Sequence, residues 1–253
     1  MGMHRARVVR VRRLTPHLAR ITLAAPSLTD FVDDGPDQRV KLLLPRPGRA
    51  LPQLDATSRW YEQWQAMADG ERPVLRTYTV RRSRPRAAEV DLDVVLHGDA
   101  GPGSAWACRA APGDEVALYG PYAEHECPPD AAWQLVVADH TALPAAAAIL
   151  EQCAPGPVQV LVEVPDAADE LDLALPDGAS LRWLHTGTGK PGRALRDAVS
   201  GTALPDGPGY AWVCADTTTV KHVRRELVSE RGMPADRVMF MGYWRTDGPI
   251  DPT

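Results

Sequence analysis

"EVDLDVVLHGDAGPGSAWA", residues Glu89–Ala107, is the stretch that decides the fold of the first half of the chain. Its first part alternates, so that Val90, Leu92, Val94 and Leu96 fall on one side and Asp91 and Asp93 on the other. Alternation with a period of two predicts a β-strand with one face in a core. The glycines and the proline that follow end this strand, and the small residues after them predict a short helix.

Similar short β-rich runs lie on both sides of this stretch and are separated by proline and glycine. Many short strands with such punctuation are typical of a small antiparallel barrel or a sandwich. A predicted helical insert, Ser58–Gly70, interrupts the series, with Trp60 and Trp64 on one helical face. The other predicted strands of this half are Arg5–Leu14, Leu18–Pro26, Arg39–Pro45, Arg76–Arg82 and Asp114–Pro121.

The second half changes to an alternation of strands and helices. Trp133–Ala138 is an apolar strand and Thr141–Gln152 a helix, with Pro144 tolerated in its first turn. The best helical pattern is Asp216–Gly232, with an aspartate as N-cap and a glycine as its end. Repeated alternation of this kind predicts a Rossmann-like α/β domain with a five-stranded parallel sheet. The further strands are Pro157–Val164, Ser180–His185, Tyr210–Ala215 and Arg237–Trp244.

The border between the halves falls in the proline-rich and polar segment Gly120–Ala132, which predicts domains over residues 1–124 and 130–253. A net charge of −5 over 253 residues gives no general argument for nucleic-acid binding. The cysteines form no CxxC pair and no cluster at metal spacing, which favours reduced thiols and no metal site. No signal peptide and no transmembrane run is recognisable, so we expect a cytoplasmic monomer without membrane insertion.

The stretch "RTYTVRR", Arg76–Arg82, alternates cations with an aromatic ring and small hydroxyls. Arg76 can pair with a diphosphate through its planar fork, and Tyr78 on the same face can stack on a planar ring. Thr79 adds a hydroxyl and a backbone N–H. An exposed strand that carries arginines for solubility would show the same pattern, so this stretch alone does not decide between the two interpretations.

The glycine-rich turn after His97 is a second candidate for ligand binding. Gly101, Gly103 and Ser104 let the backbone come close to a ligand and present N–H groups at a helix start. An ordinary turn into a helix has the same composition. Two such stretches on successive strands favour a binding site more strongly than either does alone.

Together these motifs resemble the siderophore-interacting protein family, the FAD-dependent ferric-siderophore reductases of the ferredoxin-reductase superfamily. The resemblance spans about Arg5 to Arg245, and the motifs keep the family's order. The matching segments are "RTYTVR" at Arg76–Arg81, "HGDAGPGSAWA" at His97–Ala107, "GDEVALYGP" at Gly113–Pro121, "TALPA" at Thr141–Ala145 and "FMGYWR" at Phe240–Arg245.

The resemblance implies that an FAD-binding antiparallel barrel precedes an NAD(P)H-binding α/β domain, and that the activity is NAD(P)H:ferric-siderophore oxidoreduction in the cytosol. No catalytic residue is expected beyond the flavin, with Thr79 near its reactive nitrogen. Lys41 and Arg245 are the candidates for binding the anionic ferric chelate. The implied cofactor-binding residues are Arg76, Tyr78, Thr79, Val80, His97, Gly101, Pro102, Gly103 and Ser104 in the first half, and Asp139, Thr141, Ala142, Tyr243 and Trp244 in the second.

Some segments depart from the family pattern. The family usually has Asp-Glu where this chain has Asp139-His140, Ala where it has Gly103, and Gly-Glu within the segment that reads "CADTTT", Cys214–Thr219. Lys190 and Arg193 are candidates for a 2′-phosphate, so NADH and NADPH both remain open as donors. A general flavin or quinone reductase on the same fold, and a non-catalytic flavin or siderophore binder, remain alternatives.

Overall fold

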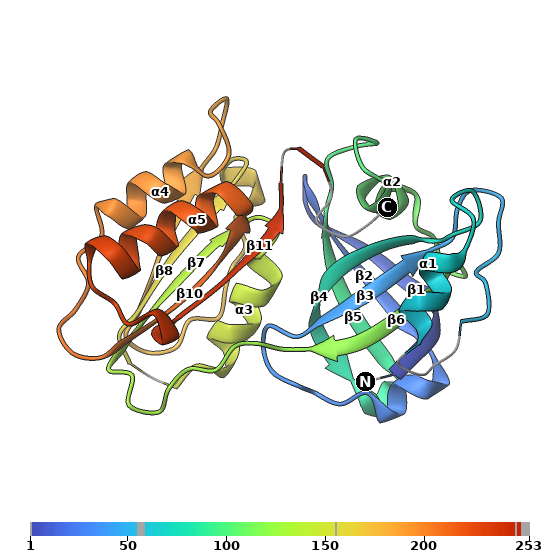
Figure 1. Ribbon diagram of the computed structural model, residues 1–253, viewed down its shortest axis with the longest axis horizontal. Coiled ribbons are helices and arrows are strands. Elements are labelled where there is room, and N and C mark those ends of the chain that lie inside the picture. The colour runs from blue at the N-terminus through green and yellow to red at the C-terminus, as the bar shows by residue number, and fades with distance from the viewer. Residues whose placement is uncertain (1, 55–58, 155, 246, 249–253) are drawn as a thin grey trace. The chain divides into compact units, whose positions relative to one another are not determined.

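The computed structural model describes residues 2–54, 59–154, 156–245 and 247–248. The chain divides into two compact units, with the change between Ala123 and Glu124 (Figure 1). Each unit has its own sheet and its own buried core.

The first unit is a closed antiparallel barrel with the strand order β1-β2-β5-β4-β3-β6. This confirms the predicted barrel and excludes the sandwich. The strands are β1 (Gly2–Thr15), β2 (Leu18–Ala24), β3 (Arg39–Leu44), β4 (Val74–Arg84), β5 (Glu89–Val95) and β6 (Glu115–Tyr122). The helical segments are η1 (Pro26–Asp30), α1 (Trp60–Ala66), η2 (Pro85–Ala87) and α2 (Pro102–Arg109).

The alternation along β5 sorts its side chains as the sequence predicts. Val90, Leu92 and Val94 are buried in the barrel interior with residues from the other strands. The outer wall of the barrel is covered by α1, whose Trp60 and Trp64 are both buried. The predicted helix Ser58–Gly70 is too long, because Met67 is already extended; its first residue, Ser58, lies outside the described residues.

Ion pairs on the outer face of β5 hold three strands together. Arg84 on β4 donates two hydrogen bonds to Asp91, at 2.6 and 2.7 Å, and Arg20 on β2 donates two to Asp93, at 2.7 and 2.8 Å. Thr22 adds a third donor to Asp91 at 2.7 Å. Burial by itself raises the pKa of Asp91, but the hydrogen bonds from Arg84 and Thr22 outweigh it and hold that pKa below its usual value.

The second unit is built on a parallel sheet with the strand order β11-β10-β7-β8-β9. The five-stranded α/β fold predicted for this half is therefore confirmed. The strands are β7 (Trp133–Asp139), β8 (Val158–Val164), β9 (Ala179–His185), β10 (Gly209–Asp216) and β11 (Val238–Trp244). The helical segments are α3 (Leu143–Gln152), η3 (Ala167–Asp169), α4 (Arg193–Ser200), α5 (Thr217–Arg225), η4 (Glu226–Glu230) and η5 (Ala235–Arg237).

The two faces of this sheet are covered by different helices. Apolar residues of α4 and α5 share one buried cluster with Leu135 and Val137 of β7, whereas α3 lies on the other side of the sheet (Figure 1). The predicted N-cap Asp216 is confirmed, since its carboxylate accepts from the N–H groups of Thr218 and Thr219. In the described part of the chain, no helix combines the length and the apolar character that crossing a bilayer requires.

We expect Asp91→Asn to lower the free energy of unfolding by about 2 kcal/mol at pH 7, because it removes one of the two described carboxylates that pair with the Arg84 guanidinium and leaves only Glu89. Asp91 has a lowered pKa in the folded protein, so its contribution is full above the usual pKa of an aspartate and is lost as the pH falls through the folded value. Urea unfolding at pH 7 and near pH 3 should therefore show a difference between wild type and variant that shrinks in acid. Glu62→Gln, which breaks an exposed pair with Arg59, is the control and should change little. An equal effect of both substitutions at pH 7 would contradict the assignment.

Candidate functional site

The start of α2 presents backbone N–H groups without a capping side chain. The N-cap residue is Gly101, which has no side chain to accept a hydrogen bond. Pro102, which has no N–H, occupies the first helical turn. The first donor to bond within the helix is Ala105, whose N–H reaches the carbonyl of Gly101 at 2.9 Å. The N–H groups of Gly103 and Ser104 are therefore left for an acceptor outside the helix, which suits an anion.

The side chain of Ser104 is used to fix this turn. Its hydroxyl accepts from the N–H of His97 at 2.8 Å and donates to the carbonyl of Gly98 at 2.8 Å. The ring of His97 is exposed and lies against Gly101, where an added Cβ would come within 3.2 Å of the ring. Of Ser104, only the backbone N–H remains for a ligand, whereas the His97 ring is accessible at the same turn.

Gly103 brings the two predicted motifs together. A Cβ on this residue would overlap the hydroxyl oxygen of Tyr78 and lie 3.7 Å from Cγ of Arg76, so a larger residue here would require the Tyr78 side chain to move. The Arg76 guanidinium donates one hydrogen bond, from Nη1 to the carbonyl of Leu75 at 2.6 Å. Its other donors have no acceptor among the described residues, and they lie on the strand face that meets the start of α2.

The residues that follow along β4 divide between the two faces of the strand. Tyr78 is half-buried and packs against the barrel core, and Val80 lies within that core. Thr79 is on the opposite face, is 4% exposed, and its hydroxyl has no hydrogen-bond partner in the described structure. A buried hydroxyl without a partner costs stability, so a bound group that pairs with Thr79 would fit this position.

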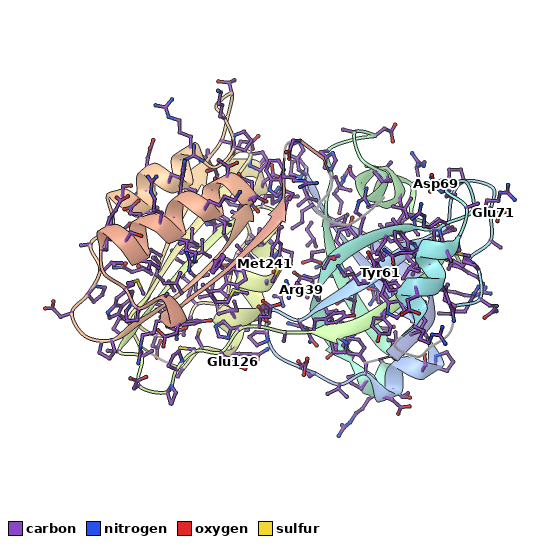
Figure 2. The ribbon with its side chains drawn as sticks, in the orientation of Figure 1. Arg39, Tyr61, Asp69, Glu71, Glu126 and Met241 are labelled. Atoms are coloured by element: carbon purple, nitrogen blue, oxygen red, sulfur yellow. The ribbon has the colours of Figure 1, made fainter. Side chains whose placement is uncertain are left out.

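Two cationic residues of β3 lie beside Thr77 and Thr79 on the adjacent strand β4. In the antiparallel register Arg39 pairs with Thr79, and Lys41 pairs with Thr77. The Lys41 ammonium donates to the Thr77 hydroxyl at 2.7 Å. Arg39, labelled in Figure 2, is 7% exposed. Arg39 was not among the residues predicted from the sequence, although its spacing of two from Lys41 on one strand places both on one face.

In the second unit, the predicted residues at the end of β7 bind one another. Asp139 Oδ1 accepts from the N–H and the hydroxyl of Thr141, at 2.9 and 2.6 Å, and from the N–H of Ala142 at 3.3 Å. Its Oδ2 accepts from the indole Nε1 of Trp244 at 2.7 Å. Burial raises the pKa of Asp139, and these four donors oppose that rise. Cofactor binding by these residues stays a prediction, and both oxygens of the Asp139 carboxylate already accept hydrogen bonds within the protein.

A second buried carboxylate on the neighbouring strand was not selected from the sequence. Glu163 on β8 accepts from the N–H groups of Gly192 and Leu195, at 2.8 and 2.9 Å, and from the hydroxyl of Thr186 at 2.7 Å. It thereby satisfies the start of α4, as Asp216 satisfies the start of α5. The only signal in the sequence was a lone carboxylate within the apolar strand "VQVLVEV".

The remaining candidates lie at the ends of strands and on loops. Tyr243 is half-buried near the end of β11, and Arg245 is exposed, 3.5 Å from the Asp247 carboxylate. Lys190 and Arg193 are exposed on the connection from β9 to α4. The structure thus brings Arg76, Tyr78 and the start of α2 together in one unit, and Asp139, Thr141, Ala142 and Trp244 together in the other.

A closed antiparallel barrel followed by a five-stranded parallel sheet is a fold shared with a ferredoxin reductase in carbazole 1,9a-dioxygenase, which is 18% identical with a TM-score of 0.66 over 95% of this chain and 69% of that chain. Family models match both units: a siderophore-interacting FAD-binding domain over residues 7–125, and a siderophore-interacting protein over residues 131–247. The chain belongs to the siderophore-interacting protein family. The resemblance inferred from the motifs is confirmed, and FAD is the cofactor of the first unit's domain family.

Similar proteins agree with this assignment. A crystal structure of a siderophore utilization protein from T. fusca has 32% identity and a TM-score of 0.83, with 98% of this chain and 95% of that chain covered. The ferric vibriobactin reductase ViuB of Vibrio cholerae is 29% identical over 94% of this chain and 87% of its own length. An NADPH-dependent ferric-chelate reductase of Escherichia coli is 35% identical over 70% of this chain and 69% of its own length.

We expect Gly103→Ala to weaken FAD binding about fivefold, since the new methyl group displaces the Tyr78 hydroxyl and shifts the start of α2. The double variant Gly103→Ala/Tyr78→Phe should recover most of that loss, because it removes the oxygen that the methyl group meets. Flavin fluorescence titration measures both affinities. Gly70→Ala, where a Cβ meets open space, is the control. Unchanged affinity in the single variant would show that the contact does not shape the site.

Proposed function

We propose that this chain is an FAD-dependent NAD(P)H:ferric-siderophore oxidoreductase that reduces Fe(III) to Fe(II) in the cytosol and so releases the iron. One observation carries the proposal: the uncapped start of α2, the Arg76 side chain and the Tyr78 ring meet at one end of the barrel. The family models and the named activities of the similar reductases support it.

The residues at this end of the barrel fit a flavin dinucleotide. The N–H groups of Gly103 and Ser104 donate to the diphosphate, and the Arg76 guanidinium adds a charge-assisted pair. The half-buried Tyr78 offers a ring edge or face to the flavin, and the unpaired Thr79 hydroxyl offers a hydrogen bond to it. The chemistry that FAD supplies when bound is acceptance of two electrons from a nicotinamide and their delivery one at a time.

The substrate explains why an acid–base pair is not needed. Hard oxygen donors hold Fe(III) tightly and Fe(II) much less tightly, so reduction alone loosens the complex. The protein must then attract an anionic chelate although its own net charge is −5. Lys41 and the buried Arg39 concentrate positive charge beside Thr79, and the exposed Arg245 adds a cation in the second unit.

The second unit supplies the site for the nicotinamide donor. The N–H groups at the starts of α4 and α5, and those of the turn before α3, already bond to Glu163, Asp216 and Asp139, so the donor's diphosphate binds to loop residues instead. Lys190 and Arg193, which are exposed after β9, are suited to a 2′-phosphate. We therefore expect NADPH to be the better donor.

Anaerobic reduction of the FAD-loaded protein tests the proposed activity. We expect NADPH, and NADH more slowly, to bleach the flavin absorbance, and an added ferric siderophore to restore it with formation of Fe(II). Arg76→Gln should weaken FAD binding at least tenfold, and Arg182→Gln, an exposed arginine on β9, should not. If neither NADPH nor NADH bleaches the flavin, the protein is a non-catalytic flavin or siderophore binder. Restoration by quinones but not by ferric chelates would identify a quinone reductase.

The docking of the chelate has a separate test. We expect Lys41→Glu and Arg245→Glu each to raise KM for an anionic ferric chelate about tenfold, because a cation near the approach path becomes an anion. Steady-state kinetics with a ferric trihydroxamate of zero net charge is the control, and its KM should change little. Unchanged KM for the anionic chelate would remove these residues from the docking surface.

A further inference from the structure

A groove of about 460 Å³ lies along α5, at the edge strand β11 of the second unit. Helix and strand lie side by side (Figure 1), and Figure 2 labels Met241 on the strand. One lining residue, Thr217, donates a hydrogen bond to the carbonyl of Trp244 at 3.0 Å, so one end of the groove lies close to the end of β11. Among its lining residues are Thr217, Lys221, Arg224, Phe240, Met241 and Gly242.

Arg224 and Phe240 form the centre of the groove. The guanidinium carbon of Arg224 lies over the Phe240 ring, 4.5 Å from its centroid. The Nε of Arg224 is buried and has no hydrogen-bond acceptor among the described residues. A buried donor without an acceptor is unfavourable, so an oxygen atom of a ligand would satisfy a group that the protein leaves unpaired.

The charged side chains that line the groove are all cations. Lys221 and Arg225 line the same groove, and Arg225 is 3.3 Å from the carboxylate of Glu230. No acidic side chain is among the described lining residues. Since the whole chain is acidic, this local cluster of cations is a site that selects an anion by its charge.

Phe240 gives the site a second requirement. It is 45% exposed on an edge strand, although large aromatic side chains are more often buried. One face of its ring is covered by Arg224, and the exposed remainder can receive a flat group. A volume of about 460 Å³ is in the range of sites for small organic ligands.

We propose that the α5–β11 groove binds a planar aromatic anion, with its ring on Phe240 and its anionic group paired with Arg224 and Lys221. This chemistry is shared by adenine nucleotides and by aryl carboxylates. The proposal does not rest on FAD binding or on ferric reduction, because all residues of the groove belong to α5, its continuation and β11. A helix face that merely keeps its cations solvated needs neither the exposed ring nor the unpaired Nε.

Isothermal titration of the FAD-loaded full-length chain tests the site, with AMP and salicylate as the two probes. Inorganic phosphate and neutral benzyl alcohol supply the charge alone and the ring alone. We expect one probe or both to bind with one-to-one stoichiometry, at least tenfold more tightly than phosphate or benzyl alcohol. Binding of AMP alone would identify a nucleotide site, and binding of salicylate alone a site for aryl acids.

Variants assign the binding to this groove. Arg224→Gln should weaken the bound probe at least tenfold and Phe240→Leu at least threefold, whereas Arg182→Gln on the opposite edge strand should leave it unchanged. Lys221→Gln is the second variant if Arg224→Gln fails to fold by circular dichroism, and it should weaken binding at least threefold. The proposal is overturned if neither probe binds, if phosphate binds as tightly as AMP, or if the groove variants bind like wild type.

Discussion

Backbone N–H groups at the start of a helix need acceptors, and the two units of this chain meet that need differently. In the second unit buried carboxylates do so, with Asp216 at α5 and Glu163 at α4. In the first unit α2 begins with Gly101 and Pro102 and has no capping side chain. In the α/β unit, carboxylates of the protein itself accept hydrogen bonds from the helix N–H groups. At the start of α2 in the barrel unit, no side chain among the described residues does so, and the acceptor would have to come from a ligand. This difference supports the proposal that a diphosphate binds at the barrel.

The barrel wall allows that site to be rigid. Strand β4 contributes Val80 to the buried interior and Thr79 to the outer face, so the same residues that close the barrel also position the site. On its other side, Arg84 ties β4 to Asp91 of β5 by two short hydrogen bonds. A site on a strand fixed in this way loses little conformational freedom when a ligand binds, and precise placement of Tyr78 and Thr79 follows from the register.

Patterns within single segments were sufficient to predict the strands and helices. Contacts between segments that are distant in the sequence could not be predicted from such patterns. The alternation of Glu89–His97 and the order of strands and helices after Trp133 were sufficient to predict the fold of each unit, because the period of the hydrophobic residues reflects which face of an element is buried. The internal hydrogen bond from Trp244 to Asp139 joins strands separated by 105 residues, and no local pattern indicates it. The position of Arg39 beside Thr79 likewise depends on the register between β3 and β4, which no local pattern indicates. Motif order, in contrast, identified the family before any geometry was considered.

The carboxyl edge of the parallel sheet limits the affinity with which the second unit could bind a nicotinamide dinucleotide. Ligands of open α/β sheets bind at this edge, yet here Asp216, Asp139 and Glu163 occupy it on three adjacent strands, β10, β7 and β8. Their charge is balanced by helix and turn N–H groups rather than by arginines, so those N–H groups have little left to give a phosphate. Attraction for an anionic donor must then come from exposed loop cations, whose effect falls as salt is added. We therefore expect the proposed nicotinamide donor to bind with modest affinity and a marked dependence on ionic strength, whereas at the barrel the N–H groups of α2 are still available to the proposed flavin.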